Sequence, residues 1–189
     1  YFIPWYNPGF FNKLEVYRLL SKNPDAKKYL PDFAPFESLE SLERMLEKYP
    51  FVYIKPNHGC FGHGVFQIRK GKDSSILIRF RDETGKNRLI KFTSLQKAYS
   101  YLRKKQKQED YCIQQGIPLI TFQESTIDFR VHTNKDDQGT WRVSAIGCKK
   151  AGQFSATTHI LSGGSVICME EALPNPEERT EIVKNLKAA

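Results

Sequence analysis

The stretch FVYIKPNHGCFGHGVFQIRK, residues 51–70, decides how this sequence is interpreted. An aromatic and β-branched run leads into Lys55, a glycine-rich segment follows, and Val65–Ile68 restores strand character. Glycine lets a backbone approach a ligand closely, and successive exposed N–H groups bind anions. The pattern therefore predicts a two-stranded flap that directs Lys55 and the backbone of Gly59, Gly62 and Gly64 at a phosphate chain.

Two common phosphate-binding motifs do not fit this segment. The pattern G-x-x-x-x-G-K-[ST] is absent. The glycines give GxxGxG followed by a strand, whereas a dinucleotide-binding fingerprint opens a helix. A lysine-bearing strand, a glycine flap and a second strand resemble the ATP-grasp enzymes. A glycine-rich hairpin turn without a ligand is the alternative interpretation.

Composition indicates an ordinary globular chain. Its 189 residues, 40% hydrophobic and 26% charged, suffice for one large domain or two small lobes. We expect a cytoplasmic protein without a membrane partner, because no apolar run is long enough to cross a bilayer and no signal peptide is recognisable. Tyr1 is expected to begin a fragment, since no initiator methionine precedes it. The four cysteines are too widely spaced for a zinc motif and suit reduced thiols.

The net charge of +8 allows two interpretations. Basic residues concentrate in Arg69–Lys72, Arg79–Arg81 and Arg103–Lys107. Such clusters can contact nucleic acid or another polyanion, but they more often form a solvated face. No helix-turn-helix, zinc-finger or RNA-binding signature accompanies them, so nucleic-acid binding is kept only as a minor alternative.

Periodicity and capping signals predict an α+β fold. Helices are expected from Asn12 to about residue 22, from Ser38 to Pro50, over Thr93–Gln108 with a capping box from Thr93, and after Asn175, with a loop over 23–35. Besides the flap, strands are expected over Ser75–Arg81, Asn87–Phe92, Tyr111–Gln115, Thr126–Thr133, Trp141–Lys149 and Val166–Met169. The expected domains are a helical lead-in over 1–50, a small lobe with the flap over 51–115, and the truncated start of a larger lobe over 116–189.

The order of these elements and the amino-acid sequences of several segments resemble the endospore coat-associated ATP-grasp family (YheC/YheD). The segments are FFNKLEVYRLLSK, YLPDF, VYIKPNHGCFGHG, CIQQGI, DFRVHTNKD and LSGGSV, and together they cover nearly the whole chain. The resemblance implies a small flap lobe of antiparallel strands plus helices, followed by the start of a larger antiparallel lobe.

The resemblance also implies roles for particular residues. Lys13 and Lys55 would hold the nucleotide phosphates, and the three flap glycines would close over them. Asp128, Arg130 and Lys149 would face the reacting phosphoryl group or the acceptor, although the first two also suit a surface ion pair. The hinge, whose backbone would meet the adenine edge, comprises Gln114, Gln115, Gly116 and Ile117.

The implied chemistry is ATP-dependent ligation of a carboxylate to an amine or a thiol through an acyl phosphate, with ATP and Mg²⁺ as cofactors. The implied partners are the carboxylate and amine substrates and components of the spore coat. A non-catalytic binding or structural protein of a spore layer is the alternative. His63, Lys149 and His159 depart from the family pattern. The magnesium-binding residues are unassigned and expected after Ala189, so this chain by itself is expected to bind ATP without turnover.

Overall fold

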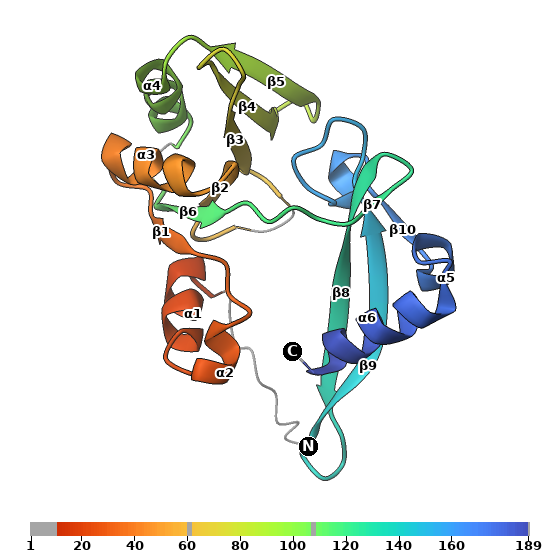
Figure 1. The fold of residues 1–189 in the computed structure, drawn as a ribbon. Helices are drawn as coiled ribbons and strands as arrows, with labels where there is room; N and C mark the ends of the chain where they lie inside the picture. The colour runs from red at the N-terminus through yellow and green to blue at the C-terminus, as the bar shows by residue number, and fades with distance from the viewer. Residues whose placement is uncertain (1–10, 60–61, 107–108, 189) are drawn as a thin grey trace. The chain divides into compact units, whose positions relative to one another are not determined.

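The computed structural model describes residues 11–59, 62–106 and 109–188, which form two compact units (Figure 1). The first unit contains the residues up to Ile78 together with Ile90–Gly116. The second contains Arg79–Leu89 and the chain from Ile117 onward. The fold class is α+β, as the sequence predicted.

The larger sheet has six strands in the order β1-β6-β2-β3-β4-β5. The pairs β1–β6, β6–β2 and β2–β3 are antiparallel. Their register sets Lys55 opposite Cys112 and Tyr53 opposite Gln114, so these four residues share one face of the sheet. The strands are β1 (Phe33–Pro35), β2 (Phe51–Pro56), β3 (Phe66–Lys70), β4 (Ile76–Arg81), β5 (Asn87–Phe92) and β6 (Tyr111–Gln115).

The other face of this sheet forms the core of the first unit. Val52, Ile54 and Ile113 alternate with the residues of the Lys55 face and are almost completely buried. Helix α3 (Leu39–Lys48) packs on β2 and β6 and against α4 (Leu95–Lys105) (Figure 1). Because two helices cover this face, the polar residues of the strands collect on the opposite one.

The N-terminal helix begins where the sequence predicted. Helix α1 (Lys13–Leu20) is capped by Asn12, whose Oδ1 accepts a hydrogen bond from the Glu15 N–H at 3.2 Å. Leu14 is buried, and the helix contacts β1. The cap therefore fixes the register that places Lys13 in the first turn.

Two local predictions were wrong. The expected loop over 23–35 contains helix α2 (Pro24–Lys27), capped by Asn23, and edge strand β1, where Pro35 is tolerated at the strand end. Helix α4 is capped by Ser94, whose Oγ accepts from the Lys97 N–H, while the hydroxyl of Thr93 instead accepts from the Lys97 ammonium.

The second unit contains a four-stranded antiparallel sheet in the order β10-β9-β8-β7. Ile127 and Cys148 are buried against Ala172 and Leu173 on the face covered by α5 and α6. The strand expected over 166–169 ends at Ile167, because α5 begins at Met169. The elements are β7 (Thr121–Phe122), β8 (Ser125–Lys135), β9 (Trp141–Lys150), the 3₁₀ turn η1 (Ile160–Ser162), β10 (Ser165–Ile167), α5 (Met169–Ala172) and α6 (Pro176–Ala188).

Cys112, Cys148 and Cys168 carry free thiols, and Cys60 lies outside the described residues. Within those described ranges, the helices all fall short of the length and apolarity needed to cross a bilayer.

Candidate functional site

Lys55 lies at the centre of a polar cluster on the face of the larger sheet opposite α3. Its Nζ donates a hydrogen bond to Gln114 Oε1 at 2.8 Å, and the Tyr17 hydroxyl donates to the same oxygen at 2.8 Å. The ammonium also stands 5.1 Å from the ring centroid of Tyr53, whose hydroxyl accepts from Gln67 Nε2 at 3.1 Å. Strands β2, β3 and β6 and helix α1 thus converge on one lysine.

The surroundings of Lys55 favour loss of its proton. Burial lowers the pKa of Lys55, the nearby Lys13 ammonium lowers it further, and Cys112 acts in the opposite sense. Burial also raises the pKa of Tyr17 and of Cys112, which favours their neutral forms. Among the described residues no carboxylate forms an ion pair with Lys55. Its positive charge is therefore oriented by neutral groups, which leaves it available to an anion.

Lys13 is hydrogen-bonded to the backbone at the start of the flap. Its Nζ donates to the carbonyl oxygens of Pro56 and Gly59 at 2.9 and 3.0 Å, and its backbone N–H donates to the carbonyl of Asn57 at 3.1 Å. The structure thus brings both predicted phosphate-binding lysines to the same strand end. The role of Lys13 as a phosphate ligand stays a prediction.

The flap glycines all adopt positive φ angles, of +157° at Gly59, +74° at Gly62 and +67° at Gly64. A Cβ at Gly64 would lie 2.8 Å from the hydroxyl oxygen of Tyr111. The turn therefore needs glycine for both its backbone conformation and the space at Tyr111. Residues 60 and 61 of the flap lie outside the described part of the chain.

The predicted hinge strand ends beside Lys55. The N–H of Gln115 donates to the Asp32 carbonyl and that of Gly116 to the Phe51 carbonyl, at 2.8 and 2.9 Å. A Cβ at Gly116 would lie 2.1 Å from the Phe51 ring, so no other residue fits without a shift. Ile117 follows at the start of the second unit and is 45% exposed. The Gln114 side chain, rather than the backbone alone, takes part in the cluster.

The second unit carries the other three predicted residues. Asp128 stands opposite Lys149 in the β8–β9 register, and Arg130 stands opposite Gly147. The alternation along the strands puts these side chains on the face opposite the Ile127–Cys148 core. Asp128 Oδ2 accepts from the Thr158 hydroxyl at 2.5 Å, and Asp128 forms no ion pair with Arg130. The alternative of a surface ion pair is therefore not what the structure shows.

Thr158 contacts one of the predicted residues, and the sequence did not reveal this contact. It is only 8% exposed and belongs to a loop whose ends meet, where a Cβ at Gly152 would lie 2.5 Å from the backbone of Gly163. The Asn87 amide donates to the carbonyls of Gln153 and Ser162 at 3.0 and 3.1 Å. These close contacts hold the loop that delivers the Thr158 hydroxyl to Asp128.

Magnesium ligands are not assembled by the described residues, since no three His, Cys, Asp or Glu side chains come together among them. Asp128 offers one carboxylate, and magnesium bound with a nucleotide usually takes one or two carboxylates together with phosphate oxygens and waters. One carboxylate does not by itself define a magnesium site.

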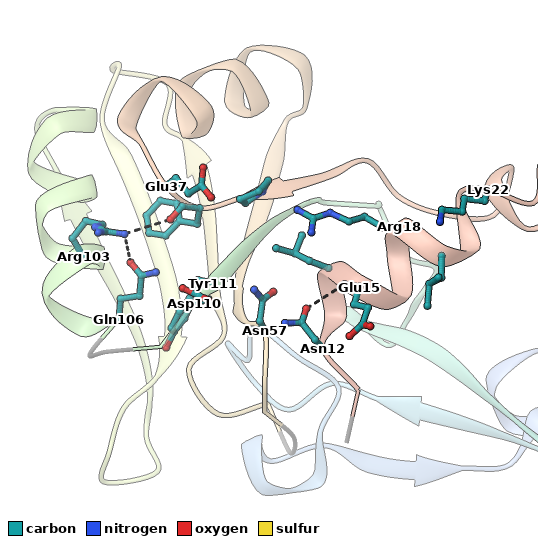
Figure 2. A pocket seen from close by; sticks show the side chains of 14 residues that line it. Asn12, Glu15, Arg18, Lys22, Glu37, Asn57, Arg103, Gln106, Asp110 and Tyr111 are labelled. Atoms are coloured by element: carbon teal, nitrogen blue, oxygen red, sulfur yellow. Dashed lines mark hydrogen bonds between the residues drawn. The ribbon is translucent and has the colours of Figure 1, made fainter. Parts of the chain in front are cut away.

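A cleft of about 760 Å³ lies on the opposite flank of α1 (Figure 2). Neither Lys13, Tyr17 nor Lys55 lines it. Asn57 lines the cleft, is 3% exposed, and its Oδ1 has no hydrogen-bond partner. The cleft is therefore distinct from the Lys55 cluster. The charged groups around the cleft are Glu15, Arg18, Lys22, Glu37, Arg103 and Asp110.

The antiparallel sheet with a lysine-bearing strand, a glycine flap and a hinge strand is the arrangement that the sequence associated with ATP-grasp proteins. A family model described as YheC/D like ATP-grasp matches residues 2–189, and the chain belongs to this family. The resemblance drawn from the sequence is confirmed.

One curated relative is similar along the whole chain. It is the endospore coat-associated protein YheD of Bacillus subtilis (strain 168), with 38% identity over 189 residues. The match covers 100% of this chain and 42% of YheD, so the chain spans less than half of that relative's length. No solved structure matches the chain.

Proposed function

We propose that this chain is the ATP-binding part of a ligase that joins a carboxylate to an amine or a thiol. The observation that carries the proposal is the Lys55 cluster, in which no carboxylate of the described residues pairs with the ammonium and Lys13 bonds the start of the flap. A triphosphate needs fixed positive charge and close backbone N–H groups, and two lysines beside a turn with three glycines support such a role.

The proposed reaction has two steps. A carboxylate oxygen of the substrate attacks the γ-phosphorus of ATP, and the bond to the ADP oxygen breaks to give an acyl phosphate and ADP. An amine or thiol then attacks the acyl carbon, inorganic phosphate leaves, and the nucleophile gives up its proton. Mg²⁺, when bound with the nucleotide, would neutralise phosphate oxygens.

The residues of this chain would act by position and charge. Lys55 and Lys13 would bind phosphate oxygens, and the glycines at 59, 62 and 64 would close over them. The hinge residues Gln114–Ile117 would meet the base. In the second unit Arg130 and Lys149 would stabilise the charge that develops on the transferred group, and Asp128 would be held in place by Thr158.

A non-catalytic binding protein is the second candidate. It is favoured by Lys149, because an ammonium cannot make the two parallel hydrogen bonds that an arginine offers to a phosphate or carboxylate. In either case we propose an association with the spore coat, on the strength of the name of the relative.

Calorimetry and phosphate release together test the proposal. The ligase predicts ATP binding by the full-length protein and release of phosphate that depends on Mg²⁺ and on an added carboxylate. ATP binding without carboxylate-dependent release under any substrate mixture would favour the non-catalytic protein. Absence of ATP binding would contradict the ligase.

A further inference from the structure

We propose that Tyr17 is a positioning residue of the nucleotide site, which holds the Lys55 ammonium in place through the side chain of Gln114. The proposal rests on the proposed function only in that Lys55 is the group assigned to phosphate. The hydrogen-bonded arrangement itself does not depend on ATP.

The geometry fixes the orientation of the Gln114 amide. Its Oε1 accepts from the Tyr17 hydroxyl and from Lys55 Nζ, each at 2.8 Å, across 97 residues in one case and 59 in the other. A carbonyl oxygen has two lone pairs, and each is occupied here. Turning the amide by 180° would set its NH₂ group against two donors, so removal of either donor weakens the preference for the observed orientation.

The lack of charge on the Gln114 amide matters as much as the orientation of this side chain. An amide directs the Lys55 ammonium without neutralising it, whereas a carboxylate at position 114 would form an ion pair and compete with phosphate. Burial raises the pKa of Tyr17, which keeps its hydroxyl protonated as a donor. Tyr17 and Gln114 thus orient the lysine without an ion pair that would offset its charge.

Tyr17 is itself packed against its neighbours. Its ring stacks against Phe33 with centroids 4.9 Å apart, and Leu14, on the same helix, is 6% exposed. Lys13, one helical turn earlier, bonds the carbonyls at the start of the flap. One edge of α1 therefore contacts both the flap and the partner of Lys55, so the hydroxyl of Tyr17 is preorganised for its acceptor.

Tyr17→Phe and Tyr99→Phe form a matched pair for the test. Tyr99 also packs on a phenylalanine, with centroids 5.5 Å apart from Phe36, and its hydroxyl donates to the Glu37 carbonyl at 3.1 Å in the same unit. Each change removes one hydroxyl donor, so a purely structural loss should be similar in both. Among the described residues, the hydroxyl of Tyr99 bonds Glu37 and its ring packs on Phe36, and neither belongs to the Lys55 cluster.

The first readout is ATP affinity, measured by calorimetry. The second is the rate at which a water-soluble amine-reactive ester acylates Lys55 in nucleotide-free, full-length protein, measured by mass spectrometry. We expect Tyr17→Phe to weaken ATP binding about 3- to 10-fold, as for a lost neutral hydrogen bond, and to raise the acylation rate about 3-fold. Tyr99→Phe should leave both within about 2-fold.

Gln114→Glu separates orientation from charge. The carboxylate keeps an acceptor for both donors but pairs with the ammonium, so Lys55 acylation should slow while ATP affinity also falls. A merely structural role for this side chain would not move the two readouts in this combination.

The outcomes distinguish the two proposals. Faster Lys55 acylation in Tyr17→Phe without any ATP binding by the wild type would leave the positioning role standing and contradict the proposed function. Unchanged acylation in Tyr17→Phe, or an equal change in Tyr99→Phe, would overturn the positioning role whatever ATP does.

Discussion

Burial makes a lysine costly to keep charged, and no carboxylate in the described part of the chain pairs with Lys55 to offset that cost. Gln114 supplies a neutral acceptor, and the ring of Tyr53 lies 5.1 Å from the ammonium. Both interactions orient the cation and leave its net charge uncompensated. This explains why an amide rather than a carboxylate faces Lys55 on the neighbouring strand.

The lowered pKa of Lys55 predicts the pH dependence of ATP binding. Because burial, aided by Lys13, lowers this pKa in the folded chain, ATP affinity should fall with rising pH, and the fall should begin at a lower pH than for an unperturbed lysine. The free energy of unfolding should change oppositely as the pH rises, since the unfolded chain binds the proton more tightly.

Lys55→Arg is the control for this pH dependence, because arginine keeps its charge throughout the range. Its affinity should be nearly independent of pH when measured by calorimetry. A wild-type profile as flat as that of Lys55→Arg would contradict the assignment of Lys55 to phosphate binding.

Among the elements, the flap depends most on one residue type. Gly64 and Gly139 have similar left-handed conformations, with φ of +67° and +75°, but a Cβ would clash with Tyr111 only at Gly64 and meets nothing within 4 Å at Gly139. Backbone strain should cost each alanine variant about 1 kcal/mol of stability. Gly64→Ala should lose additional stability because of the clash with Tyr111, and it alone should weaken ATP binding.

Denaturant unfolding and calorimetry on the two variants measure these effects. Equal losses of stability together with unchanged ATP affinity in Gly64→Ala would show that the turn at Gly64 has no part in the nucleotide site. Gly139 lies in the turn between β8 and β9. The stability of Gly139→Ala therefore measures the cost of backbone strain without a clash.

Local patterns were enough to predict most of the elements, while contacts between distant residues were not. The flap, the hinge strand and the cap of α1 follow from glycines, alternation and Asn12. Helix α2 and strand β1 were missed, because four and three residues carry too weak a periodic signal. Nothing in the sequence linked Tyr17 to Gln114, 97 residues away, or Thr158 to Asp128, 30 residues away.

At the scale of the whole molecule, the residues with proposed roles fall into two sets, one in each unit. The first unit carries Lys55, the flap and the hinge, and the second carries Asp128, Arg130 and Lys149. Nucleotide binding is therefore expected to depend mainly on the first set, and transfer of the phosphoryl group mainly on the second.

Arg130→Ala tests this division. Loss of a guanidinium that stabilises the reacting group should lower the carboxylate-dependent phosphate release of the full-length protein at least about 100-fold, while ATP affinity stays within about 2-fold. Arg142→Ala is the matched control, since Arg142 lies on the same sheet and pairs with Asp136 at 3.0 Å in an exposed position. Equal rates in the two variants would contradict a role for Arg130 in transfer.

The central claim, that the Lys55 cluster binds the phosphates of ATP, is tested most directly by calorimetry on Lys55→Ala beside Lys97→Ala. Lys97 is an exposed lysine on α4 of the same unit whose ammonium contacts only Thr93 in the bonds described. Loss of the charged hydrogen bond should weaken ATP binding by about 1–3 kcal/mol in Lys55→Ala and leave Lys97→Ala unchanged. ATP affinity in Lys55→Ala equal to that of the wild type would contradict the claim.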